Sequence, residues 1–205
     1  MDRELKRWEA ALILGVLCAL VLGCWLNREQ RELADSVIRL HIIANSDSPA
    51  DQALKLAVRD RVLEQAESLC PEGATLEETR RTLEEHLRVL AAAGRRVVEE
   101  QGYDYPVAAG LTRCWFPTKD YGEFALPAGE YEALQVVIGA GEGQNWWCVA
   151  FPPLCLGAAS ETLEEAVQAG RFSPDQAALI SGGQGEYVLK FRFLELLGQF
   201  RHLFS

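Results

Sequence analysis

The sequence predicts an α+β protein with an N-terminal membrane or signal helix, followed by an antiparallel β-meander covered by a helical hairpin and a C-terminal helix. Three observations support this prediction. An uncharged run spans Ala10–Leu26, apolar residues recur at helical spacing between residues 51 and 101, and from Tyr103 onward they alternate as in strands. We therefore expect a signal peptide or membrane anchor at residues 1–27, a linker at residues 28–36 and an exported α+β domain at residues 37–205.

The N-terminal run has the flanks of a membrane segment. Three basic residues among the first seven precede Ala10–Leu26, and cations on that side favour export of the residues after the run. A run of about 17 residues is near the lower limit for a bilayer span and the upper limit for a signal-peptide core. Cys24 also stands in a weak match to a lipoprotein cleavage box. Cleavage, retention and lipidation therefore stay open, with a buried soluble helix as the remaining alternative.

The charge balance excludes one class of partner. The chain has 20 Lys and Arg against 30 Asp and Glu, a formal net charge of −10, and no cluster of cations beyond its N-terminus. Binding to nucleic acid requires clustered cations that neutralise phosphates, so it is not expected.

The exported domain is expected to open with a strand and a helix. Val37–Ala44 alternates, with Ile38, Leu40 and Ile42 on one face and Arg39, His41 and Ile43 on the other. Ser48 suits a helix cap and Pro49 the first helical position, so a helix is predicted at Asp51–Cys70.

A second helix and a set of strands come next. Thr75 and Glu78 have capping-box spacing before a helix at Leu76–Gln101, which would complete the hairpin. The strands of the meander are predicted at Tyr105–Phe116, Gly122–Leu126, Tyr131–Ile138 and Trp146–Phe151, with Thr118–Gly122 as a hairpin turn.

The C-terminal part is expected to be mixed. Two short helices are predicted to begin at Thr162 and Ser173. A half-buried strand, Tyr187–Phe193, and a terminal helix, Leu194–Phe204, would come after them, and the helix would pack on the sheet.

The cysteines depend on export for their interpretation. Cys70, Cys114, Cys148 and Cys155 lie in the exported part, where they allow three pairings. Cys148 and Cys155 flank a Phe-Pro-Pro turn and would close a short disulfide loop, while free buried thiols are the alternative. No Cys-x-x-Cys occurs and the histidines are scattered, so neither a metal nor another cofactor is expected.

One constellation could carry chemistry. His41 lies on a predicted strand, and Asp47 lies in the loop after it, which would suit an exported hydrolase. No nucleophile elbow, metal spacing or phosphate loop accompanies them, and turn and capping chemistry also favours Asn-Ser-Asp before a helix. We therefore expect no catalytic residues, with a hydrolase that uses His41 and Asp47 as the alternative.

Several segments resemble the stage II sporulation protein R family. They lie between residues 38 and 155 in consistent order, and the stretch after Cys155 is less characteristic. The segments include Ala44-Asn45-Ser46-Asp47-Ser48, Phe116-Pro117-Thr118-Lys119, Pro127-Ala128-Gly129-Glu130-Tyr131-Glu132-Ala133, Asn145-Trp146-Trp147-Cys148-Val149 and Phe151-Pro152-Pro153-Leu154-Cys155.

The resemblance implies a role in endospore formation. Members of the family are made in the forespore and exported into the space between the two membranes. There they act as the signal that activates a membrane-embedded aspartic protease of the mother cell, which processes pro-sigma-E. The resemblance carries over no catalytic residue. It implies a secreted or membrane-anchored signalling domain that contacts the membrane through its N-terminal segment.

The two segments that resemble the family most closely, the loop Asn45–Asp47 and the strand Trp146–Phe151, suggest a contact surface. Adjacent Trp residues on a strand point to opposite faces, so Trp146 and Trp147 cannot both enter one core. The loop before the first helix offers more polar groups than one cap needs. We expect both segments to form one partner-binding surface, made of Asn45, Ser46, Asp47, Trp146, Trp147 and Phe151. The alternative is that the loop only caps a helix and the strand is only part of the core.

Overall fold

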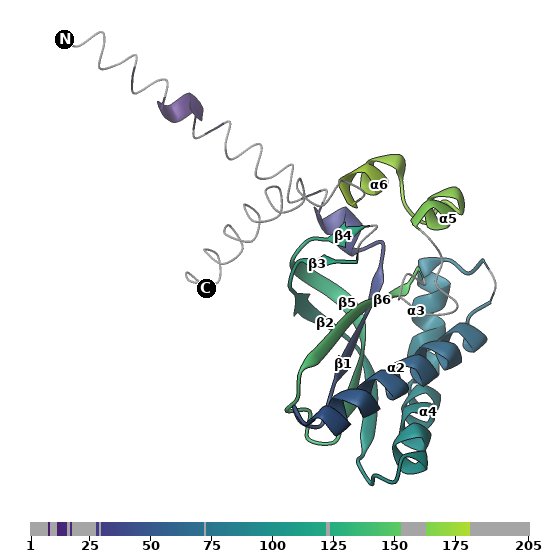
Figure 1. The fold of residues 1–205 in the computed structure, drawn as a ribbon. Coiled ribbons are helices and arrows are strands. Elements are labelled where there is room, and N and C mark those ends of the chain that lie inside the picture. The colour runs from purple at the N-terminus through teal and green to yellow at the C-terminus, as the bar shows by residue number, and fades with distance from the viewer. Residues whose placement is uncertain are drawn as a thin grey trace. The chain divides into compact units, whose positions relative to one another are not determined.

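The computed structural model describes residues 8, 12–15, 17, 28, 30–71, 73–121, 124–152 and 163–180 (Figure 1). The chain divides into two units, Met1–Leu33 and Ala34–Ser205. Residues 30–34, within the predicted linker, are helical. No helix in the described part of the chain is both long enough and apolar enough to cross a membrane, and most of the predicted run Ala10–Leu26 lies outside that part.

The second unit is α+β, as predicted, but its main sheet is mixed and the predicted antiparallel meander is wrong. The four strands lie in the order β2-β5-β1-β6, in which β1 is parallel to β5 and antiparallel to β6. Nearly all of β1 is buried on both faces, which suits a strand inside a sheet and explains its insertion between β5 and β6. The strands are β1 (Ile38–Ile43), β2 (Val107–Phe116), β5 (Gly129–Ile138) and β6 (Asn145–Phe151).

A small second ladder lies between β2 and β5 in the chain. It pairs β3 (Lys119–Asp120) with β4 (Ala125–Leu126). Lys119 and Asp120 therefore form a short strand where the sequence predicts a turn, and β4 contains the last two residues of the strand predicted at Gly122–Leu126.

The first helix begins as its sequence predicts. In α2 (Pro49–Leu69), the Ser48 hydroxyl accepts a hydrogen bond from the Asp51 backbone N–H at 3.1 Å, and Pro49 occupies the first turn. Both predicted capping interactions are therefore present, one here and one at Thr75, where the capping box with Glu78 is complete.

The helix predicted at Leu76–Gln101 is in fact two helices. α3 (Leu76–Glu85) ends and α4 (Leu87–Glu100) begins at His86, whose φ of −112° and ψ of 16° leave the helical region. The His86 ring nitrogen Nδ1 lies 2.7 Å from the Thr82 carbonyl oxygen, a local side-chain bond that competes with regular helix geometry. No Gly or Pro marks this break in the sequence.

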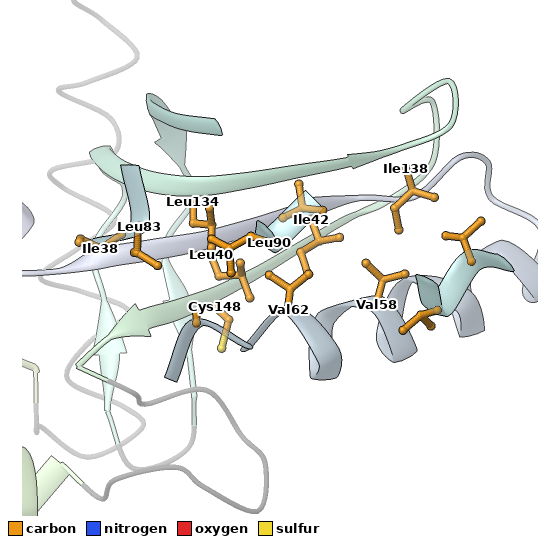
Figure 2. Close-up of a cluster of buried hydrophobic side chains, with 14 of the residues drawn as sticks. Ile38, Leu40, Ile42, Val58, Val62, Leu83, Leu90, Leu134, Ile138 and Cys148 are labelled. Carbon is orange, nitrogen blue, oxygen red and sulfur yellow. The ribbon is translucent and has the colours of Figure 1, made fainter. Parts of the chain in front are cut away.

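The core lies between one face of the sheet and the helices (Figure 2). Leu40, Ile42 and Leu134 point from the sheet toward Val58 and Val62 of α2, and all five side chains are buried. At about 25 cal/mol per Å² of apolar surface, such burial is the main source of stability for the domain. The other face of the sheet carries Arg39 and His41 instead, because strand side chains alternate.

Two short helices come after the sheet. They are α5 (Leu163–Gln168) and α6 (Pro174–Ile180), close to where the sequence predicts helix starts. Ser173 and Gln176 exchange capping hydrogen bonds of 2.8 and 3.1 Å. The predicted strand Tyr187–Phe193 and helix Leu194–Phe204 lie outside the described residues.

Candidate functional site

The predicted loop and the predicted strand lie beside each other. The loop after β1 meets the segment before β6 through backbone bonds from Gly143 N–H to the Ala44 carbonyl, at 3.0 Å, and from Glu142 N–H to the Asn45 carbonyl, at 3.2 Å. The Gln144 N–H also donates to the Asp47 carboxylate at 2.7 Å. Two stretches about a hundred residues apart in the sequence thus form one end of the sheet.

Asp51 is the polar centre of this end. Its Oδ2 accepts hydrogen bonds from the Ser46 hydroxyl at 2.5 Å and from the Asn45 side-chain amide at 2.9 Å. These two bonds lower the pKa of the Asp51 carboxyl below its usual value, and the bond from Ser46 has the larger effect. The residue is 4% exposed, so its charge is stabilised mainly by these neutral donors.

The side chains of Asn45 and Lys55 extend the network to the loop before β6. The Asn45 Oδ1 accepts from the Ala140 N–H, and the Lys55 Nζ donates to the Gln144 carbonyl, both at 2.9 Å. Burial lowers the pKa of the Lys55 ammonium, and the nearby Asp47 carboxylate opposes that shift. The polar side chains of the first loop that do not cap α2, those of Asn45 and Asp47, therefore join this loop to the loop before β6.

Two glycines make this junction possible. A Cβ at Gly143 would lie 2.3 Å from the Ser46 carbonyl oxygen, and a Cβ at Gly139 would lie 2.1 Å from the Asn45 Oδ1. Gly139 also has a φ of +59°, which favours glycine. Only residues without a side chain let the loops approach this closely.

The two tryptophans point to opposite faces of the sheet, as predicted for neighbours on a strand. Trp146 packs on the core side, where the Arg59 guanidinium of α2 lies 4.6 Å from its ring centroid. Trp147 lies on the other side and stacks on His41, with 3.9 Å between ring centroids. Both are half-buried. The Nε1 of Trp146 is buried without a hydrogen-bond acceptor among the described residues.

The remaining predicted residues lie farther along β6. Phe151 is 8% exposed, and the Arg171 guanidinium lies 5.0 Å from its ring centroid. Cys148 is buried and takes part in a disulfide, while Cys70 and Cys114 are free thiols. Cys155 lies outside the described residues, so its pairing with Cys148 stays a prediction.

A buried arginine stands on the second face of the sheet. Arg39 is fully buried, and its guanidinium lies 4.1 Å from the Phe116 ring centroid and 4.8 Å from that of Tyr131. It donates to the Tyr121 hydroxyl and, at 3.4 Å, to the Cys148 carbonyl. In the described part of the chain, Arg39 contacts aromatic rings and neutral oxygens. Because it bonds to both Tyr121 and Cys148, it links the β3–β4 segment to β6.

His41 lies next to Arg39 on the same face, among side chains from three other strands. Its Nε2 is 2.9 Å from the Asn145 Oδ1, and its Nδ1 is 3.1 Å from the Gln135 Nε2 and 3.9 Å from the Cys114 Sγ. Burial lowers the pKa of the His41 imidazole, and the bond to Asn145 partly opposes this. Among the described contacts none joins His41 to Asp47, which instead binds the Gln144 N–H.

Comparison with known proteins identifies the family. The model of the family described as stage II sporulation protein R matches residues 34–161. The chain belongs to the stage II sporulation protein R family. Stage II sporulation protein R of Bacillus subtilis (strain 168) is 42% identical over 124 residues, which are 60% of this chain and 55% of that protein. The chain thus aligns with little more than half the length of that relative, and no solved structure matches.

The stage II sporulation protein R match contains every strand of the main sheet and both joined loops. It also contains five residues of the described networks that the sequence did not indicate as site residues, namely Arg39, Asp51, Lys55, Cys114 and Gln135. Period-two alternation places Arg39 with His41 on one face of the predicted strand, and it could also have placed Cys114 with Phe116. It could not have shown which strands are neighbours, because strand order depends on long-range pairing.

Proposed function

We propose that this chain is an exported sporulation signal that activates a membrane-embedded aspartic protease of the mother cell, which then processes pro-sigma-E. Its membership of the stage II sporulation protein R family carries this proposal. In it, the N-terminal segment directs export from the forespore into the intermembrane space, and the domain stays anchored or is released by cleavage.

The proposed contact surface is the end of the sheet where the loop at residues 45–47 meets the start of β6. Asp47 is exposed there, and Asn45, Ser46, Trp146 and Trp147 are half-buried. The hydrogen-bond network of Asp51 holds this end in one conformation, which lowers the entropy lost when a partner binds. β6 is also the last of the described strands in the sheet order, and we propose that a partner approaches it from that side.

The proposal is tested in a spore-forming strain that lacks its own stage II sporulation protein R. The full chain should restore processing of pro-sigma-E, and failure at normal protein level would contradict the proposed function. Trp146→Phe and Trp147→Phe should each reduce processing while the protein stays folded. Trp115→Phe is the matched control, because Trp115 is 44% exposed on β2, at the opposite edge of the sheet. Full processing by all three variants would move the contact surface elsewhere.

The alternative, a hydrolase that uses His41 and Asp47, makes a different prediction. His41→Ala and Asp47→Ala would then abolish processing while folding and binding to the protease stay intact. A signal that acts by binding predicts instead that any loss of processing accompanies a loss of binding.

A further inference from the structure

Three side chains from three strands meet on the face of the sheet that points away from α2. The Cys114 Sγ of β2 lies 3.9 Å from the His41 Nδ1 of β1, and the His41 Nε2 lies 2.9 Å from the Asn145 Oδ1 of β6. We infer that Cys114, His41 and Asn145 form a nucleophilic thiol site that attacks the carbonyl carbon of a small activated ester or thioester. The order of roles is nucleophile, base and group that orients the base.

The hydrogen bonds assign the proton on the imidazole. The Asn145 Oδ1 can only accept, so the His41 Nε2 carries the hydrogen and donates it. The Nδ1 then carries the lone pair, which accepts a hydrogen bond from the Gln135 Nε2 at 3.1 Å and faces the Cys114 Sγ at 3.9 Å. Transfer of the thiol proton to Nδ1 therefore replaces the bond from Gln135. Asn145 is therefore a positioning residue, which acts on the thiol only through His41.

Aromatic packing fixes the ring in this orientation. Trp147 stacks on His41 with an interplanar angle of 18°, and Phe116 contacts it edge-on, with ring centroids 6.0 Å apart. His41 is 6% exposed. A base held in one rotamer beside a thiol loses little entropy when the reaction begins.

Protonation states agree with general-base chemistry. Burial raises the pKa of the Cys114 thiol and lowers that of His41, so near neutral pH the pair is a thiol and a neutral imidazole. Among the described residues, the other titratable and charged groups beside the pair on this face are Arg39, Tyr121 and Tyr131, and Arg39 favours the thiolate. The neutral imidazole is the form that can remove the thiol proton.

The reaction balances without an added oxidant or reductant. As the bond from Sγ to the carbonyl carbon forms, the thiol proton passes to the His41 Nδ1. The bond from carbon to the leaving oxygen or sulfur then breaks, and the proton passes to that atom. Water, deprotonated by His41, finally attacks the thioester on Cys114, which releases the carboxylic acid and restores the thiol.

The surroundings favour an activated acyl donor. The Gln135 side-chain amide has two N–H groups, of which one donates to the His41 Nδ1 and the other is a neutral donor for the carbonyl oxygen of a substrate. One such donor suits an ester or thioester, whose leaving group departs more readily than an amine. Space for the acyl group lies beside it: Gly110 pairs with Gln135 across the strands, and a Cβ there would meet no atom within 4 Å. Thr112, between Gly110 and Cys114 on that face, is exposed.

The test uses the purified full chain and p-nitrophenyl acetate, with acetylation of each cysteine measured by peptide mass spectrometry. Cys70 is the internal control, because it is also a half-buried free thiol whose pKa burial raises. Acetylation of Cys114 should be at least about tenfold faster than that of Cys70, since a positioned base contributes that much or more. In His41→Gln the two rates should become similar. Equal rates in the unmodified chain would overturn the proposal.

The pH profile keeps the test decisive if His41→Gln does not fold. In the unmodified chain, acetylation of Cys114 should rise with pH through an inflection below 6.5, the ordinary pKa of histidine, and then level off. Asn145→Ala should move that inflection to still lower pH, because it removes the hydrogen bond that raises the pKa of His41. A rate that rises only with ionisation of the thiol at alkaline pH would contradict the role of His41.

Discussion

The side-chain amide of Asn45 donates a hydrogen bond to the Asp51 carboxylate at 2.9 Å, across the junction of β1 and α2. The same amide group accepts from the Ala140 N–H through its oxygen, also at 2.9 Å. One side chain thus links the start of a helix to a loop nearly a hundred residues later. The stability of this end of the sheet should therefore depend on a few side chains and on the close approach of the loops.

Asp51→Asn should destabilise the domain by about 1.5–3 kcal/mol, the usual contribution of hydrogen bonds to a charged group. The substitution removes the charge while Asn45 and Ser46 still point at the site. Urea unfolding of both proteins measures the difference. Glu64→Gln is the control, because the contact of Glu64 among the described residues is an exposed ion pair with Arg61, and its loss should change stability by less than about 0.5 kcal/mol.

The contribution of Asp51 should depend on pH in one direction. Its pKa is lower in the folded than in the unfolded state, so the unfolded chain binds more protons between the two values. The stabilisation is therefore complete above the unfolded pKa of about 3.9 and is lost as the pH falls through the folded pKa. The difference in unfolding free energy between the native protein and Asp51→Asn should shrink below pH 4. A difference that stays constant down to pH 2 would show that the charge of Asp51 is not responsible.

Gly143→Ala should cost about 1–3 kcal/mol, because the new Cβ would meet the Ser46 carbonyl oxygen and force the two loops apart. Gly110→Ala is the matched control on the sheet. A Cβ at Gly110 meets no atom within 4 Å, so this change should leave stability unchanged or raise it by up to about 1 kcal/mol. Thermal or urea unfolding distinguishes the two, and equal effects would contradict the close approach at Gly143.

Cys148 and Cys155 should be paired after the proposed export, as their positions on either side of the Phe-Pro-Pro turn predict. Thiol labelling without reduction should then modify Cys70 and Cys114 but leave Cys148 and Cys155 unlabelled. Intact mass before and after reduction should differ by two hydrogens for this pair. Labelling of both Cys148 and Cys155 without reduction would refute the pairing.

Removal of Met1–Asn27 should abolish signalling without unfolding the domain. The segment lies within a unit separate from Ala34–Ser205, and the buried hydrophobic cluster between the sheet and the helices lies wholly in the second unit. The truncated chain should show a circular dichroism spectrum of mixed helix and strand and should unfold cooperatively. Kept in the forespore cytoplasm, it should not support processing of pro-sigma-E; if it does, the proposed export is wrong. Sequencing the mature N-terminus of the full chain would distinguish cleavage from retention.

Local signals in the sequence predict most of the described elements. The caps at Ser48, Thr75 and Ser173 depend on side chains within three residues of the groups they bind, so they are readable from the sequence alone. The break at His86 is not, because it depends on a histidine side chain bonding to the turn before it, with no Gly or Pro as a signal. The mixed sheet escapes prediction because alternation shows which residues share a face and not which strands are neighbours.

In the candidate site, too, features set by local sequence could be predicted and features set by long-range strand pairing could not. The opposite orientation of Trp146 and Trp147 follows from the pleat of a strand, and its prediction is confirmed. Closeness in sequence suggests Asp47 as the partner of His41, whereas the neighbours of the imidazole come from positions 114, 135 and 145. These contacts exist only once β1 lies between β5 and β6, so no local pattern could have indicated them.

The place of β1 also sets when the domain can fold. Arg39 pairs with Ala133 and Ile42 with Trp146, so the first strand to leave a ribosome or a translocation channel is the last to gain both neighbours. Such long-range pairing gives a high contact order, and loop closure must precede most of the gain from burial. Until residue 151 has emerged, the apolar side chains of β1 have no sheet to enter and remain available to chaperones. The chain is therefore expected to fold after its sheet-forming part is complete, and an exported form can cross a membrane unfolded.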